Sequence, residues 1–152
     1  MKTERTVVLT RVFDAPRERV YAMWTQAQHL QQWFAPRGFT VPTCETDPKP
    51  GGTFRLCMRA PDGDEYWVRG VFRELERPAR VVIFCVADDE DGNLSLEETI
   101  EATFTEKNGK TTLALKATAS GSSERARFML GGMEEGWHQT VDRLPSALDS
   151  GS

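Results

Sequence analysis

Hydrophobic and polar residues alternate along most of the chain, which is typical of β-strands with one buried face. The alternation is clearest in residues 53–60, where Phe54, Leu56 and Met58 share one parity. Six other segments show strand character and are separated by turn-forming residues. The seven predicted strands cover residues 5–13, 39–46, 53–60, 65–76, 79–87, 94–106 and 110–119.

Helical spacing of apolar residues replaces this alternation directly after the first strand. Val20, Met23 and Trp24 predict a helix over residues 15–25, and a second short helix is expected over residues 26–34. Apolar residues three or four positions apart lie on one face of a helix, so both segments can cover part of a sheet.

The C-terminal part of the chain, residues 122–148, is predicted to form one long amphipathic helix. Its apolar stripe consists of Leu130, Met133, Trp137, Val141, Leu144 and Leu148. Gly131-Gly132 is expected to kink this helix or split it in two. Pro145 is expected to bend the last turn, because a proline ring clashes with the preceding turn of a helix.

The order of elements is one strand, two short helices, six strands and a long helix. Consecutive strands joined by short turns form an antiparallel meander. Asn108-Gly109 is the best hairpin signal in the chain and joins the last two strands. One face of the sheet needs an apolar cover, and the last helix is the long amphipathic element left to supply it. The sequence therefore predicts an α+β fold with a curved antiparallel sheet of about seven strands around the C-terminal helix.

Composition and charge narrow the function classes. The chain has 152 residues, of which 39% are hydrophobic and 28% charged, and this favours a single globular domain over residues 1–152. A net charge of -4 gives no electrostatic support to a nucleic-acid partner. Membrane insertion is not expected, because no apolar run approaches ~20 residues.

The three cysteines, Cys44, Cys57 and Cys85, match neither a metal-binding spacing nor a disulfide framework. The N-terminus lacks the long apolar stretch of a signal peptide. We therefore expect a cytoplasmic protein with reduced cysteines. No metal or cofactor is predicted.

No catalytic motif is visible in the sequence. The histidines His29 and His138 have no Ser, Cys or Asp partner at a known motif spacing. The acidic segment 88–91 lacks the alternating ligands and the distal Glu of a calcium-binding loop. Surface roles are expected for all of these residues.

Glu98 is the titratable residue with the most interesting position. It shares the strand parity of Ile100 and Phe104, which are expected to face the core. A carboxylate that points into an apolar cavity needs a partner or a raised pKa. The alternative interpretation places Glu98 near the end of its strand, where water solvates it.

Aromatic and methionine side chains supply the remaining candidates for a ligand pocket. Met129, Met133 and Trp137 lie at successive turns of the predicted helix, and Gly131-Gly132 leaves room beside them. Methionine suits irregular ligand-lined walls, and the Trp N–H can orient a polar ligand group. The candidate pocket-lining residues are Trp33, Phe34, Phe39, Phe54, Met58, Trp67, Phe84, Glu98, Met129, Met133 and Trp137. An ordinary filled core remains the alternative.

Several segments, in this order and spacing, resemble one known family. They read LTRVFDAPRERVYAMWT, HLQQWFAPRGFTV, CETDPKPGGTFRLCMRAPDGDEYWVRGVFRELERPARVVIF and EEGWHQTVDRL. The chain resembles the START-like (SRPBCC) superfamily over residues 5–148, and within it the branch named after the activator of heat-shock-protein-90 ATPase homologues. The resemblance implies a helix-grip fold whose cavity, between sheet and C-terminal helix, binds apolar molecules.

Three functions remain open at this point. The favoured one is a carrier or sensor that binds a small apolar or aromatic molecule in the cavity. The second is a protein-interaction module of the chaperone-activator type, although the sequence shows no counterpart of the separate N-terminal domain of the eukaryotic activators. The third is a cyclase-like or hydrolase-like enzyme that uses Glu98 in the same pocket. A homodimer is compatible with each, because the edge strands of an open sheet need protection.

Overall fold

The computed structural model describes residues 2–88 and 96–150, which form one curved sheet with helices packed on it. The strands are β1 (Thr3–Phe13), β2 (Thr40–Thr46), β3 (Thr53–Arg59), β4 (Glu65–Glu76), β5 (Arg80–Asp88), β6 (Leu96–Lys107) and β7 (Lys110–Gly121). The helices are α1 (Arg17–Thr25), α2 (Ala27–Trp33), α3 (Glu124–Gly131), α4 (Met133–Asp142) and α5 (Leu144–Ser150). The predicted α+β order of elements is confirmed.

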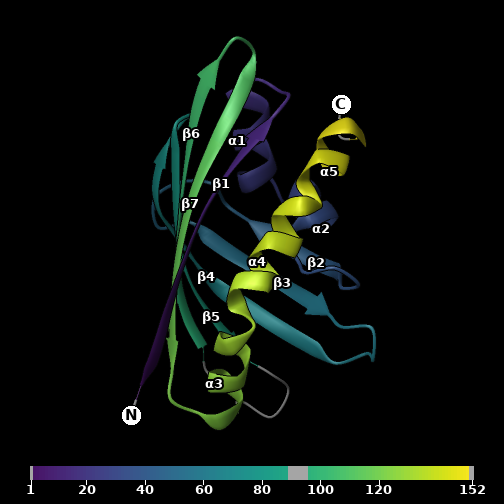
Figure 1. The fold of residues 1–152 in the computed structure, drawn as a ribbon, viewed down its shortest axis with the longest axis vertical. Coiled ribbons are helices and arrows are strands. Elements are labelled where there is room, and N and C mark those ends of the chain that lie inside the picture. The colour runs from purple at the N-terminus through teal and green to yellow at the C-terminus, as the bar shows by residue number, and fades with distance from the viewer. Residues whose placement is uncertain (1, 89–95, 151–152) are drawn as a thin grey trace.

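The sheet is antiparallel throughout, with the strand order β1-β7-β6-β5-β4-β3-β2. Strands β2 to β7 form the predicted meander, and β1 pairs with β7 from Thr3 opposite Gly121 to Phe13 opposite Thr111. Asn108 and Gly109 both have positive φ values, as the tight hairpin between β6 and β7 requires. Figure 1 shows α3, α4 and α5 following one another across one face of this sheet.

The predicted long C-terminal helix is divided into three helices. Gly132, with φ -100° and ψ 5°, separates α3 from α4, so the expected split at the glycine pair is confirmed. The helix is interrupted a second time at Arg143, just before Pro145, so the expected disturbance near Pro145 is present. Pro145 lies in the first turn of α5, where its missing N–H breaks no helical hydrogen bond.

The core lies between the concave face of the sheet and the helices. Trp24 of α1 and Trp33 of α2 are fully buried and pack edge to face with ring centroids 4.9 Å apart. The Trp33 indole N–H donates to the carbonyl of Met23 over 2.9 Å and so fixes α2 against α1. These two buried rings pack α1 against α2, and the Trp24 ring also lies against the middle of α4.

None of the helices in the described part of the chain is both long and apolar enough to cross a membrane.

Candidate functional site

A cavity of about 190 Å³ lies between the sheet and the C-terminal helices. Its wall is mostly apolar, and Glu98 is its only acidic or basic side chain within the described residues. The lining residues are Phe34, Ala35, Pro36, Met58, Leu96, Glu98, Ala119, Met129, Leu130, Gly132, Met133, Gly136, Trp137 and Thr140.

Two features of the sequence create this space. On the sheet side, Glu98 of β6 lies directly opposite Ala119 of β7, whose methyl group fills little volume. On the helix side, Gly132 and Gly136 present no side chain to the cavity. Because Ala119, Gly132 and Gly136 contribute so few side-chain atoms, a hollow remains between sheet and helices. Met133 and Trp137 line this hollow but do not fill it.

Glu98 is held by a single hydrogen bond from the opposite wall. The Trp137 indole Nε1–H donates to Glu98 Oε2 over 2.9 Å. Burial raises the pKa of Glu98 to about 7, and the hydrogen bond from Trp137 opposes part of that rise. Near neutral pH, both the protonated and the ionised carboxyl are therefore populated at the wall of an apolar cavity.

Cys85 lies directly opposite Glu98 on the other neighbouring strand, β5. Burial, and next the charge of Glu98, raise the pKa of its thiol well above the ordinary value. Cys85 therefore remains a neutral thiol and is not activated as a nucleophile.

Aromatic contacts fix the orientation of Trp137. Its ring stacks on that of Trp24 at a centroid distance of 6.4 Å and an interplanar angle of 10°. The Phe34 ring meets Trp137 edge on at 5.8 Å. Because these rings hold the indole plane, its N–H stays directed at Glu98.

The structure brings six of the sequence-predicted candidates to the cavity. They are Phe34, Met58, Glu98, Met129, Met133 and Trp137. Trp33 and Phe54 are instead fully buried in the core, outside the cavity lining. Phe39 packs beside Tyr66 at a ring-centroid distance of 6.4 Å.

The prediction that Trp67 and Phe84 line the pocket is wrong, because both side chains lie on the opposite face of the sheet. Buried Ile83 and Cys85 alternate with Phe84 and face the core. Arginine side chains cover both rings: the Arg55 guanidinium lies 4.3 Å from the Trp67 ring centroid, and that of Arg73 lies 4.4 Å from Phe84.

Sequence reasoning anticipated Gly132 as part of the glycine pair that leaves room. It did not name the other lining residues, which are Ala35, Pro36, Leu96, Ala119, Leu130, Gly136 and Thr140. One signal was available in β7, where the inward parity changes from Leu113 and Leu115 to Ala117 and Ala119. This change from large to small side chains places free volume at the end of β7 that lies next to α3.

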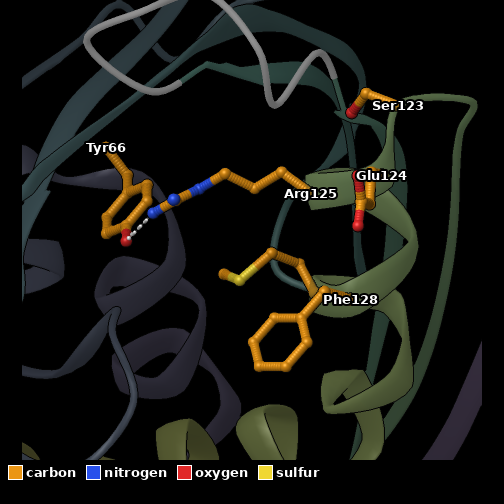
Figure 2. A pocket seen from close by; sticks show the side chains of 6 residues that line it. Tyr66, Ser123, Glu124, Arg125 and Phe128 are labelled. Carbon is orange, nitrogen blue, oxygen red and sulfur yellow. Dashed lines mark hydrogen bonds between the residues drawn. The ribbon is translucent and has the colours of Figure 1, made fainter.

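Two open grooves flank α3 on the surface, beside the cavity. The first has a volume of about 670 Å³ and is lined by Tyr66, Ser123, Glu124, Arg125, Phe128 and Met129. Figure 2 shows Arg125 reaching from α3 toward Tyr66, whose hydroxyl accepts a 2.7 Å hydrogen bond from the guanidinium. Met129 lines the cavity and both grooves, so it lies at the boundary between the interior and the surface.

A curved antiparallel sheet that holds a C-terminal helical segment, with a cavity between them, defines a helix-grip protein of the START-like class. More narrowly, the chain belongs to the family described as Activator of Hsp90 ATPase homolog 1-like protein, whose model matches residues 14–149.

Solved structures share this fold over nearly the whole chain. A protein from Arthrobacter aurescens has a TM-score of 0.80 at 24% identity, with 95% of this chain and 86% of that chain covered. The AHSA1 protein from Silicibacter pomeroyi has a TM-score of 0.78 at 23% identity, with 97% and 100% covered. A protein of unknown function from Staphylococcus aureus has a TM-score of 0.78 at 19% identity, with 99% and 96% covered. No curated protein matches the chain. At these identities, the likeness shows the fold and not the function.

Proposed function

We propose that this protein binds a small apolar or aromatic molecule in the cavity between the sheet and α3–α4, as a carrier or sensor. The observation that carries this proposal is the composition of the wall: apolar side chains surround a single hydrogen-bonded pair, Glu98 and Trp137. Ligand sites commonly combine an apolar lining with a few polar groups that fix the orientation of the ligand.

The size of the cavity limits the size of the ligand. A dry cavity of ~150 Å³ is enough to bind benzene. At about 190 Å³ the cavity accommodates one ring with a short substituent, and a larger ligand would have to displace Met129 toward the surface.

Burial of apolar surface would provide most of the affinity. A single-ring ligand that buries ~200 Å² gains about 5 kcal/mol at ~25 cal/mol per Å². Before the entropic cost of association is subtracted, that free energy corresponds to a dissociation constant of roughly 0.2 mM, so apolar burial alone gives weak binding. Tighter binding therefore requires the ligand to use the Glu98–Trp137 pair.

Native mass spectrometry of freshly purified protein tests the proposal first, because a co-purifying small molecule would support carriage. Titration with ethylbenzene, followed by amide NMR shifts, tests the cavity directly. We expect shifts centred on Met133 and Trp137, and we expect Met133→Trp, which fills the cavity, to abolish them. The proposal fails if no co-purifying molecule and no binding are found across ligand libraries, or if Met133→Trp leaves the binding intact.

A further inference from the structure

The Glu98 carboxyl has unused hydrogen-bonding capacity. Oε2 accepts the Trp137 N–H, and among the described residues no other hydrogen bond or ion pair reaches the Glu98 carboxyl group. A carboxylate offers about four lone-pair sites on two oxygens. Glu98 lines the cavity, so a bound molecule can reach this remaining capacity.

No cation in the described part of the chain balances the charge of Glu98. The strand partners of Glu98 are Cys85 and Ala119. The other side chains that line the cavity from β3, α3 and α4 are Met58, Met129, Leu130, Met133, Trp137 and Thr140, and none of them is charged. The Cys85 thiol is neutral, since burial raises its pKa. The Thr140 hydroxyl already donates to the carbonyl of Gly136 over 2.8 Å. Glu98 is only partly buried, but no cation among the described residues pairs with its ionised carboxylate, so a ligand that carries a cation can supply that partner.

The charge of Glu98 favours a cation over an anion at this wall. The Trp137 and Phe34 rings border the cavity and offer apolar surface to the ring of a ligand. A ligand carboxylate would instead meet the Glu98 charge in an apolar setting, where like charges repel strongly.

We propose that the cavity selects single-ring molecules that carry one protonated amine, with the amine bound to Glu98 and the ring packed against Trp137, Phe34 and Met133. This inference rests on the proposed function and names its ligand class. The ammonium group donates charge-assisted hydrogen bonds to the free carboxylate sites, and the Trp137 N–H retains its own bond to Oε2.

Binding of such a ligand is coupled to the protonation of Glu98. The ammonium group requires the ionised carboxylate, whose population rises as the pH passes the Glu98 pKa of about 7. Between about pH 6 and pH 8 the ionised fraction increases roughly tenfold, and the apparent affinity should increase by the same factor. A neutral ring has no such dependence.

The test uses four probes of similar size: benzylamine, benzyl alcohol, ethylbenzene and benzoate. Each is titrated by calorimetry or NMR at about pH 6 and pH 8 into the full chain and into the variant Glu98→Gln. We expect benzylamine to bind at least tenfold more tightly than ethylbenzene at the higher pH, and benzoate to bind most weakly. Glu98→Gln should remove both the preference for benzylamine over ethylbenzene and the pH dependence of benzylamine binding.

The outcomes separate this inference from the function on which it rests. If ethylbenzene binds and benzylamine shows no preference, or if Glu98→Gln keeps the preference, the amine selection is wrong and the apolar-ligand function stands. If no probe binds, the amine selection is wrong, and the apolar-ligand function fails with it when ligand libraries and co-purification are also negative. The pH profile of the unmodified chain decides the question even if Glu98→Gln does not fold, because an affinity for benzylamine that stays flat between about pH 6 and pH 8 also overturns the inference.

Discussion

The indole N–H of Trp137 donates to Oε2 of Glu98 over 2.9 Å, and this bond joins the middle of α4 to the start of β6. Trp24 and Phe34 hold the indole ring in place. The bond therefore has a fixed donor and an acceptor whose charge depends on pH.

The first prediction concerns stability against pH. The pKa of Glu98 is raised from 4.5 to about 7 in the folded protein, so the folded state binds more protons than the unfolded state between these values. The contribution of Glu98 to stability is thus complete below about pH 4.5 and is lost as the pH rises through 7, by about 3 kcal/mol in total. Urea unfolding at several pH values measures this change.

Glu98→Gln provides the matched control, because the amide oxygen can still accept the Trp137 N–H but does not titrate. We expect the difference in unfolding free energy between the two proteins to shift by about 2 kcal/mol from pH 5 to pH 8 in favour of Glu98→Gln. A difference that stays constant across this range would show that Glu98 titrates normally.

The second prediction concerns Trp137→Phe, which keeps most of the aromatic packing and removes the donor. The hydrogen bond lowers the pKa of Glu98, so its loss should raise that pKa further above 7. Carbon-13 NMR of the Glu98 carboxyl during a pH titration measures the shift.

Trp24→Phe is the control for this measurement. The Trp24 indole stacks on Trp137, and its own Nε1 has no hydrogen-bond partner within the described residues. This substitution should leave the Glu98 pKa in place. If Trp24→Phe and Trp137→Phe raised the Glu98 pKa equally, the increase would come from changed ring packing and not from loss of the hydrogen bond.

The orientation of side chains could be predicted from the sequence only where one strand face is clearly more polar than the other. In β6, parity correctly placed Glu98 with Ile100 on the concave face. In β5, both parities are apolar, so the pattern gave no orientation, and Phe84 lies outward beneath Arg73. The coverage of an outward aromatic ring by an arginine from the neighbouring strand depends on strand register, which the chain pattern does not reveal.

The order of elements could be predicted because each strand and turn carries its own local signal. The place of the cavity beside Met129, Met133 and Trp137 was predicted, but its full lining could not be, because part of its volume arises from residues with little or no side chain, such as Ala119 and Gly136. Small residues occur at many positions, and only the packed fold shows which of them lie opposite one another.

The third prediction concerns Gly70, where strands β4 and β5 approach closely. A Cβ at Gly70 would lie 1.9 Å from the backbone oxygen of Phe84 and 2.6 Å from Cα of Cys85. Gly70→Ala should therefore destabilise the fold by about 3 kcal/mol or more, since backbone must move to relieve the clash. Thermal and urea unfolding measure the loss.

Gly136→Ala is the contrasting substitution. A Cβ at Gly136 meets no atom within 4 Å, and the residue lies inside α4. Alanine should stabilise the protein by up to about 1 kcal/mol through its higher helix propensity. If both glycine variants lost equal stability, the close approach at Gly70 would not be the cause of its effect.

The last prediction concerns Arg143, which follows α4 and holds the connection between α2 and β2. Its Nη1 donates to the carbonyls of Ala35, Pro36 and Phe39 at 2.8, 3.2 and 3.2 Å. Ala35 and Pro36 line the cavity, so this one side chain supports part of its wall. Arg143→Met keeps the aliphatic length and removes the donors, and it should cost about 2 kcal/mol because partly buried carbonyls lose a charged partner.

The readout that distinguishes this local role from a general loss of stability is amide hydrogen exchange. Exchange is measured without denaturant. In Arg143→Met we expect faster amide exchange in residues 34–39, while the amides of β6 and β7 exchange at the same rate as in the unmodified protein. Arg11→Met is the matched control, because Arg11 pairs with Asp142 at 2.5 Å from β1 and contacts none of the three carbonyls. Equal exchange in residues 34–39 of both variants would remove Arg143 from the support of the cavity wall, whereas a selective increase in Arg143→Met, together with weaker ethylbenzene binding, would establish that the wall depends on it.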